Sequence, residues 1–301
     1  MRCIICNSNS SMYDCIRDYE YRIPHCITLH RCDTCGSIRH GAIPNYESIA
    51  RFYPDDYFIH NASFREGSGR LFSKLKDILY GMKAKRVVKY IGKSGNILDI
   101  GCANGAFLKS VRGLGEYNLY GLDIKDTGID FKKESITFRK VAFEDMLYPY
   151  DYFNAIVLDN LIEHVPNPSI FLKKVLKVLK PGGYVFGTTP NFNSIDRIMF
   201  GKYWGGFHMP RHIYIFNHGN LEVLLRKTGF EKVRFPVTLN AGSWAVGVQN
   251  YCRRNKPRQK KYRRSLYFPI IGIGFAPIAF IGSMFNINGV MDFIARKPES
   301  K

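Results

Sequence analysis

The segment ILDIGCANGAFL (97–108) constrains the fold most, because an apolar strand pattern runs into a glycine-rich turn and then into an apolar helix start. Glycine has no Cβ, so the backbone of such a turn can approach a ligand closely. Asp123 ends the next apolar run, 22 residues after Gly101. A carboxylate there can accept hydrogen bonds from both ribose hydroxyls. The pattern predicts a nucleoside site; the alternative is a tight turn followed by an ordinary surface Asp.

The loop does not fit a dinucleotide. In the G-x-G-x-x-G pattern of such sites, Ala103 and Ala106 would occupy the second and third glycine positions. Asp99 lies within the first strand, just before the loop. An acid at this place argues against NAD and favours a nucleoside that carries a charged amino-acid tail.

Strand and helix patterns alternate from Asn96 onward, which predicts an α/β fold with a mostly parallel sheet and helices on both faces. Helical spacing indicates a linking helix over 70–91 and further helices over 169–180 and 220–229, the last two ending near glycine. The expected strands are the short apolar runs 96–100, 119–124, 136–142, 154–159, 183–189, 230–237 and 290–297.

Residues 95–235 resemble the class I S-adenosylmethionine-dependent methyltransferases. The resemblance is carried, in this order, by LDIGCANG, GLDI, LIEHVPNP, LKPGG and TTPN. LIEHVPNP followed by LKPGG is similar to ubiquinone-biosynthesis O-methyltransferases and to related enzymes of bacterial surface-sugar gene clusters. The resemblance implies a Rossmann-like methyltransferase sheet and methyl transfer from S-adenosylmethionine to a sugar, a lipid-linked sugar or a quinone-like small molecule. It does not identify the acceptor atom.

The same resemblance implies a cofactor role for eight residues. Loop residues would lie under the methionine part, and the acid before the loop would orient it. Acids after the next three strands would bind the ribose, lie beside the adenine and approach the amino-acid tail. The loop residues are Gly101, Asn104 and Gly105, and the acid before the loop is Asp99. Asp123 would bind the ribose, Glu144 or Asp145 would lie beside the adenine, and Asp159 would approach the amino-acid tail.

Transfer to a hydroxyl requires a base, and three histidines are candidates. We expect His212, in WGGFHMPRHIYIF, to be the base, with His164, in LIEHVPNP, as the second candidate and His208 as the third. The alternatives for His164 are contact with a divalent cation together with Glu163, or capping of the turn that follows it.

The segment 189–216, which contains His208 and His212, is expected to form a lid over the acceptor pocket. Gly205 and Gly206 would give this lid its flexibility, and its aromatic side chains would exclude water. The alternative is an ordinary surface loop.

Two C-x-x-C pairs near the N-terminus, Cys3/Cys6 and Cys32/Cys35, are separated by 25 residues. Four thiolates at such spacing predict a structural zinc site in preference to a redox pair. This region resembles the zinc-binding region found before some sugar methyltransferases, and we expect it to have a core separate from that of the sheet.

The N-terminal residues MRCIICNSNS do not form a signal peptide, so we expect a cytoplasmic, reducing environment without disulfides. We therefore expect Cys15 and Cys26 to be buried small hydrophobes.

The domain boundaries expected from these features are a zinc-binding region over 1–60, a linking helix over 61–94 and a methyltransferase domain over 95–301. The last domain is interrupted by an insertion at about 243–288.

The net charge of +19 favours an anionic partner, and residues 253–264 supply eight of these charges. The uncharged stretch 266–291 follows directly. We expect the insertion to dip into one leaflet of an anionic membrane, which places the protein peripherally on the inner face. The alternative is packing on the protein's own surface or in a homodimer. A zinc-ribbon RNA-binding protein or RNA methyltransferase is a further alternative, but the basic run contains one aromatic residue, Tyr262, so nucleic acid is disfavoured.

Overall fold

The computed structural model describes residues 1–20, 26–44, 51–52, 70–126, 128–145, 147–238, 240–255 and 268–299. Within these residues a seven-stranded sheet has the order β10-β11-β8-β7-β4-β5-β6. Neighbouring strands from β8 to β6 are parallel, and β11 is antiparallel to both β8 and β10. The strands are β4 (Ser94–Ile100), β5 (Glu116–Asp123), β6 (Ile136–Lys140), β7 (Phe153–Asp159), β8 (Leu179–Pro190), β10 (Glu231–Arg234) and β11 (Val290–Arg296).

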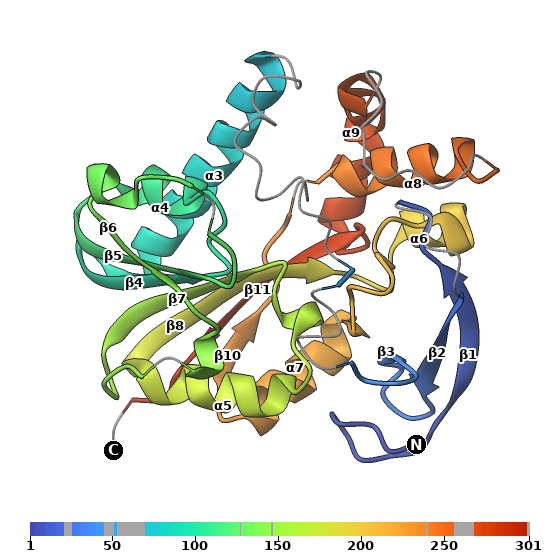
Figure 1. The fold of residues 1–301 in the computed structure, drawn as a ribbon, viewed down its shortest axis with the longest axis horizontal. Coiled ribbons are helices and arrows are strands. Elements are labelled where there is room, and N and C mark those ends of the chain that lie inside the picture. The colour runs from blue at the N-terminus through green and yellow to red at the C-terminus, as the bar shows by residue number, and fades with distance from the viewer. Residues whose placement is uncertain are drawn as a thin grey trace.

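Helices cover both faces of this sheet (Figure 1). One face packs on α3 (Arg70–Ile91) and α4 (Ala106–Val111), whose buried residues join those of β4, β5 and β7 in one core. The other face packs on α5 (Pro168–Val178) and α7 (His218–Lys227). These two helices start as their sequences dictate, because Asn side chains cap them, and α5 has Pro at its first turn.

The predicted α/β fold class is confirmed, and every predicted strand is present with ends shifted by a few residues. The largest shift is in β8, which begins at Leu179 and not at Gly183 because Leu179 already pairs with Phe153 of β7. Short 3-10 helices follow several strands at the end where the loops lie. They are η1 (Phe131–Glu134), η2 (Phe143–Asp145) and η3 (Ile162–His164), after β5, β6 and β7, whereas a fourth, η4 (Gly201–Tyr203), directly follows the helix at residues 195–200.

The N-terminal region forms a second, four-stranded sheet together with a strand from the methyltransferase part. Its strands are β1 (Ser10–Arg17), β2 (Cys26–Cys32), β3 (Ile38–His40) and β9 (Tyr214–Ile215), with Ile38 of β3 opposite Ile215 of β9. Cys3, Ile5 and Cys32 belong to the same buried cluster as residues of α5 and α7. The expected separate N-terminal core is therefore wrong, because β9 and this shared cluster join the region to the body of the molecule.

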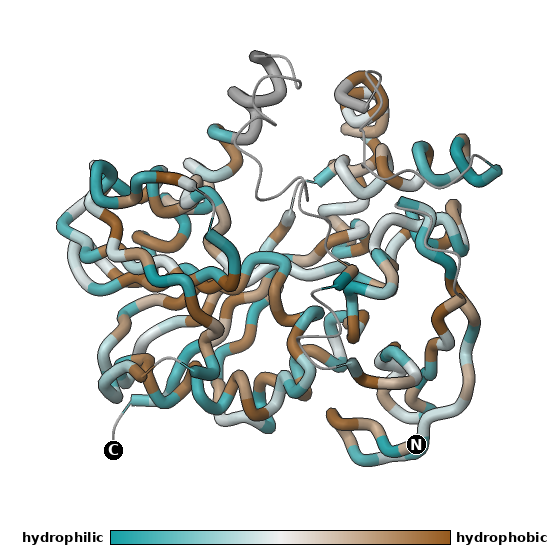
Figure 2. Tube along the Cα trace, viewed as in Figure 1, coloured by the Kyte–Doolittle hydropathy of each residue, from teal (hydrophilic) through white to brown (hydrophobic). Residues whose placement is uncertain are grey.

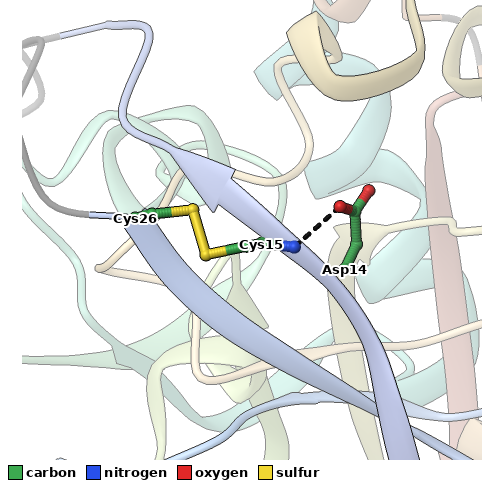
Figure 3. The surroundings of a disulfide bond; sticks show 3 residues. All are labelled: Asp14, Cys15 and Cys26. Carbon is green, nitrogen blue, oxygen red and sulfur yellow. Dashed lines mark hydrogen bonds between the residues drawn. A yellow bond between two sulfur atoms is a disulfide. The ribbon is translucent and has the colours of Figure 1, made fainter.

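Cys15 and Cys26 were expected to be buried small hydrophobes in a chain without disulfides, and both expectations are wrong. Both residues are exposed, and a disulfide joins them across β1 and β2 (Figure 3). Cys15 lies opposite Thr28 and Arg17 lies opposite Cys26, so the two cysteines are diagonal neighbours on one face of the hairpin. Their Cα atoms are 5.6 Å apart, within the range that a disulfide bridges.

Between β10 and β11 the chain leaves the sheet and forms α8 (Gly242–Cys252) and α9 (Phe268–Met284). In Figure 1, α8 lies beside α6 (Ile195–Phe200), and α9 packs on α8 through Phe275 and Trp244. Residues 256–267, which contain most of the basic run, are outside the described residues. No helix in the described part of the chain is both long and apolar enough to cross a membrane.

Candidate active site

The glycine loop between β4 and α4 has the backbone conformation that its sequence suggests. Gly101, Ala103 and Gly105 have φ values of 77°, 46° and 67°. The amides of Gly101 and Cys102 donate to the carbonyl oxygen of Leu122, at 2.8 and 3.0 Å, which ties the loop to β5. A Cβ on Gly105 would lie 2.7 Å from the Phe131 ring, so glycine is required there by both conformation and space.

Asp123, at the end of β5, lies directly against this loop. Its Oδ2 accepts a hydrogen bond from the amide of Ala103 at 2.9 Å, and its Oδ1 accepts one from Lys125 at 3.0 Å. Each carboxylate oxygen can accept a second hydrogen bond, so the group can still bind two hydroxyls. The next side chain, Ile124, is exposed, and an apolar side chain beside a ribose site suits a flat base. Sequence reasoning missed this residue.

Three carboxylates face one another at this edge of the sheet. Burial raises the pKa of Asp99 well above its usual range, the charges of Asp159 and Asp123 raise it further, and Lys83 opposes them. Lys83 comes from α3, forms an ion pair with Asp159 and donates to Thr188 Oγ1 at 2.9 Å. Three acids around one cation favour a ligand that brings positive charge and hydroxyl groups. S-adenosylmethionine carries a sulfonium, an ammonium and two ribose hydroxyls, so these residues fit it.

Lys83 lay in the predicted linking helix, where nothing in its spacing marked it as a site residue. Tyr80, one turn earlier on α3, lies in the same environment, because burial and the charges of Asp159 and Asp99 raise its pKa to about 12. The linking helix is thus a wall of the candidate cofactor site.

The two candidates for the adenine position lie in η2. Glu144 is half-buried and Asp145 is exposed. Lys174 of α5 donates a hydrogen bond to the backbone carbonyl of Glu144. The roles given to these two acids, and those of Asn104 and the other loop residues, remain predictions.

His208 has both ring nitrogens engaged with charged residues. Arg211 Nε donates to its Nε2 at 2.8 Å, so its Nδ1 carries the proton and donates to Glu20 Oε1 at 2.6 Å. Arg211 is fully buried and also pairs with Asp18 at 3.2 and 3.3 Å. Asp18 and Glu20 belong to the N-terminal region, so this network of hydrogen bonds connects that region to the segment that contains His208 and Arg211. Sequence reasoning missed Asp18, Glu20 and Arg211.

His212 and Glu163 form a different kind of pair. His212 Nδ1 donates to the carbonyl oxygen of Gly206 at 2.9 Å, so its Nε2 carries the lone pair and lies 3.9 Å from Glu163 Oε1. Thr189 donates to Glu163 Oε2 at 2.9 Å, whereas Oε1 has no hydrogen-bond partner among the described residues. Burial raises the pKa of Glu163 to about 8, and the nearby charge of Asp159 contributes to this shift. The pair therefore adjoins the carboxylates of the cofactor site.

His164 completes this group. Its Nδ1 donates to the carbonyl oxygen of Arg211 at 2.9 Å, its ring centre lies 4.6 Å from that of His212, and burial lowers its pKa to about 4. One ligand atom from each of Glu163, His164 and His212 lies within 4.8 Å of the others. Both predicted base candidates are thus brought together, and burial also keeps the pKa of His212 well below its usual range.

The segment expected to be a flexible lid is packed into the protein. Trp204, Phe207 and Met209 are buried in one cluster with Ile16 and Leu29 of the N-terminal sheet. A Cβ on Gly205 would lie 2.4 Å from Val246, and one on Gly206 would lie 2.1 Å from the Trp204 ring. These glycines permit close packing, so the expectation of flexibility is wrong.

The four predicted zinc ligands come together at the base of the N-terminal sheet. All four sulfur atoms lie within 4.8 Å of one another, with Cys3–Cys35 at 3.7 Å and Cys6–Cys32 at 3.3 Å. Sulfur atoms around a tetrahedral zinc with 2.3 Å bonds would be about 3.8 Å apart. A hydrogen bond from Cys35 lowers the pKa of the Cys3 thiol to about 4, which favours the thiolate that binds metal.

The two cysteine turns also have the same backbone form. Asn7 (φ 66°) donates its amide to the carbonyl of Cys3, and Gly36 (φ 68°) donates its amide to the carbonyl of Cys32, at 2.8 and 3.1 Å. In each turn the sulfur of the first cysteine accepts a backbone amide at 3.4 Å. The donor set therefore fits a closed zinc site of four thiolates.

The fold and the loop define a class of protein, and comparison with known proteins agrees. A family model described as a methyltransferase domain matches residues 74–234, more than half of the chain. The matched region includes the cofactor edge, the histidine group and part of α3. The sheet order, the loop and this match define a class I S-adenosylmethionine-dependent methyltransferase, and the chain belongs to this methyltransferase-domain family.

Curated relatives include the ubiquinone biosynthesis O-methyltransferases of Dechloromonas aromatica and Shewanella pealeana. The first is 31% identical over 107 residues, covering 32% of this chain and 45% of the relative. The second is 31% identical over 118 residues, covering 36% of this chain and 50% of the relative. The chain spans about half the length of these relatives.

Solved structures with the same fold include the cyclase SpnF, with a TM-score of 0.51, 19% identity and coverage of 73% of this chain and 81% of that one. The complex between the Haloferax volcanii Trm112 methyltransferase activator and the putative methyltransferase gives a TM-score of 0.50, at 12% identity and with coverage of 76% and 93%. At these identities the similarity concerns the fold alone.

Proposed function

We propose that the chain transfers the methyl group of S-adenosylmethionine to a hydroxyl of a sugar, a lipid-linked sugar or a quinone-like small molecule, in bacterial surface-polysaccharide biosynthesis. The observation that most directly supports a hydroxyl as the methyl acceptor is the buried pair of His212 and Glu163 beside the cofactor carboxylates. The names of the curated relatives, which are O-methyltransferases, support the same acceptor chemistry.

The bound cofactor supplies an electrophilic methyl group on a positively charged sulfur. Asp123 would hold the ribose, Asp99 and Asp159 would hold the positively charged groups, and Lys83 would bind the cofactor's carboxylate. His212 Nε2 would accept the hydroxyl proton as the new O–C bond forms and the S–C bond breaks. Because burial raises the pKa of Glu163 to about 8, its carboxyl group would stabilise the resulting imidazolium once it has ionised, that is in the alkaline range, where an adjacent carboxylate favours the charged form.

The alternative role for this group is a divalent-cation site made by Glu163, His164 and His212. Two imidazoles and one carboxylate suit zinc or another transition metal, and the three side chains already converge. In that case the cation would bind and acidify the acceptor hydroxyl. Metal-dependent turnover that survives removal of the cysteine-bound metal would favour this alternative.

Two variants test the proposal at separate steps. Asp123→Ala should weaken binding of S-adenosylmethionine by about 1–3 kcal/mol in calorimetry, whereas Asp126→Ala, an exposed acid in the next turn, should leave it unchanged. His212→Ala should lower turnover by about two orders of magnitude or more with cofactor affinity retained. Tighter binding of NAD than of S-adenosylmethionine would contradict the cofactor assignment.

We also propose one structural zinc ion per chain, bound by Cys3, Cys6, Cys32 and Cys35. The converging sulfurs and the two matching turns support this site. Elemental analysis of protein purified under reducing conditions should give one zinc per chain. A lipid-linked acceptor would additionally place the protein peripherally on the inner face of a membrane.

A further inference from the structure

The helix α9 presents an apolar surface that the rest of the described protein does not cover. One side packs on α8, where the Phe275 ring stacks on Trp244 with centroids 4.8 Å apart, and Ala279 is buried on the same side. The remainder is open to solvent and rich in large apolar side chains. Those more than half exposed are Ile270, Ile273, Phe280, Ile281 and Met284, and together with the equally exposed Phe285, directly after the helix, they are here called the α9 surface.

Such a surface is costly to leave in water, and contiguous exposed apolar patches usually mark an interaction site. Figure 2 shows apolar residues of α9 beyond the body of the molecule, and Figure 1 shows α9 projecting on the same side as α3, which forms one wall of the cofactor site. A partner bound to the α9 surface would therefore lie on the side of the molecule from which α3 extends.

The charges next to α9 indicate the kind of partner. No charged residue occurs over 266–291, whereas 253–264 contains eight basic residues and no acidic one. Arg254, at the end of α8, is exposed and lies over the Tyr251 ring, which is itself exposed. An apolar surface next to concentrated positive charge is complementary to a bilayer with anionic headgroups. Two copies of this chain joined through α9 would offer each other no acidic complement, because no Asp or Glu occurs over 253–291.

The path of the chain determines how this surface meets a membrane. β10 and β11 are neighbours in one sheet, so the excursion through α8 and α9 starts and ends on the same side of any bilayer. Ser283 is held to the body through a hydrogen bond to the carbonyl of Thr238 at 2.7 Å. α9 is thus fixed at its C-terminal end and exposes its apolar side along its length.

We propose that the α9 surface is a peripheral membrane-binding site for bilayers that contain anionic lipid. The apolar side chains enter the boundary between headgroups and acyl chains, and the basic sequence before α9 attracts lipid phosphates. This inference goes beyond the proposed methyl transfer and does not depend on it, because lipid binding is measured without cofactor or acceptor.

The test is flotation of the full chain with vesicles of phosphatidylcholine containing 30% phosphatidylglycerol, and with vesicles of phosphatidylcholine alone. Wild-type protein should float with the anionic vesicles at low salt and much less with neutral ones. The double variant Ile273→Asp/Phe280→Asp should bind at least about 100-fold more weakly, since it loses two apolar anchors and gains two negative charges. Ile170→Asp on α5 is the matched control, because Ile170 is 64% exposed, close to the 58% of Ile273, and lies outside the α9 surface.

The electrostatic part has its own variant. Arg253→Gln/Arg254→Gln should lower partitioning onto anionic vesicles about 25-fold, at roughly fivefold for each basic residue. Unfolding temperatures equal to that of the wild type would show that all variants are folded.

Wild-type protein that stays unbound on anionic vesicles at low salt would overturn the proposal. Equal flotation of the double variant and the wild type would also overturn it. Sedimentation velocity distinguishes the other occupant: a wild-type dimer that becomes monomeric in the double variant, without flotation, would assign the α9 surface to a second copy of the chain.

Discussion

A histidine beside an expected active site need not be a catalytic group, as His208 shows. Its two ring nitrogens are taken by Glu20 and Arg211, and burial and the charge of Arg211 keep its pKa well below the usual range. It connects the N-terminal region to the segment before β9. His212, four residues later, has a lone pair directed toward Glu163 at 3.9 Å. Residue type alone cannot separate these two roles, because hydrogen-bond partners decide them.

The buried carboxyl of Glu163 predicts a specific pH dependence of stability. Burial raises its pKa from the usual 4.5 to about 8 in the folded protein. The folded state then binds a proton that the unfolded state has lost, so this contribution is complete below about pH 4.5 and is lost as the pH rises through 8. Glu163→Gln should remove this slope, of about 1 kcal/mol per pH unit.

Urea unfolding of wild type and variant from pH 5 to pH 9 measures this difference. The two curves should converge at low pH, and the variant should be relatively more stable at high pH. Parallel curves over the whole range would mean that Glu163 is already ionised in the folded protein at low pH.

At the scale of elements, α3 belongs to the candidate cofactor site and not only to the connection between regions. Lys83 contacts Asp159 and Thr188, and Arg86, almost one turn later, contacts Asp292 of β11 at 2.8 Å. Two cations thus fix this helix against the carboxyl end of the sheet.

We expect Lys83→Met to weaken binding of S-adenosylmethionine by about tenfold or more, because a charge-assisted hydrogen bond to the cofactor carboxylate would be lost. Lys85→Met, on the exposed side of the same helix, should have no effect. Calorimetry on both variants measures the difference. Equal affinities would show that Lys83 only neutralises Asp159.

The segment before β9 is rigid because its glycines are packing positions. Gly206→Ala would place a methyl group 2.1 Å from the present position of the Trp204 ring. We expect a loss of about 2–3 kcal/mol in the free energy of unfolding, as for other overpacked sites. Gly81→Ala on α3, where nothing lies within 4 Å of the new Cβ, should be neutral or stabilising. If urea unfolding showed no change in the free energy of unfolding for Gly206→Ala, the segment would be a flexible lid after all.

At the scale of the whole molecule, the N-terminal region and the methyltransferase part are joined by extensive buried contacts. They share a sheet through β9, a buried cluster that contains Cys3 and Cys32, and the buried pair of Asp18 with Arg211. Loss of the proposed zinc should therefore destabilise the methyltransferase part as well as the N-terminal region.

Cys6→Ser should lower the unfolding temperature of the whole chain by at least about 5 °C and weaken cofactor binding, since metal binding contributes directly to folding. Cys252→Ser, at the exposed end of α8, is the control. Scanning calorimetry should show one transition in each protein. Two separate transitions in Cys6→Ser, with the upper one unmoved, would indicate independent regions.

Local patterns were sufficient for much of this protein. Short apolar runs, helical apolar spacing and glycine at helix ends depend on neighbouring residues, so the strands of the main sheet, α3, α5 and α7 could be predicted. The glycine loop and Asp123 also lie close in sequence, and the two C-x-x-C pairs have a spacing that is informative without a fold.

The predictions that failed concern contacts between distant segments. The pairing of Cys15 with Cys26 depends on the register of β1 and β2, and the packing of Gly205 and Gly206 depends on side chains that approach them in space. Lys83 and Arg211 became site residues only through Asp159 and Asp18, which lie 76 and 193 positions away in the sequence.

The sequence by itself determined the class of fold, the cofactor loop and the set of candidate ligands, because each is encoded in short-range pattern and residue chemistry. The tertiary structure decided that Arg211 occupies the Nε2 lone pair of His208 whereas that of His212 lies toward Glu163, that Lys83 of α3 meets Asp159 at the cofactor edge, and that the N-terminal region shares its core with the sheet. These follow from burial and from the partners that each polar atom finds, and both exist only once distant parts of the chain have packed together.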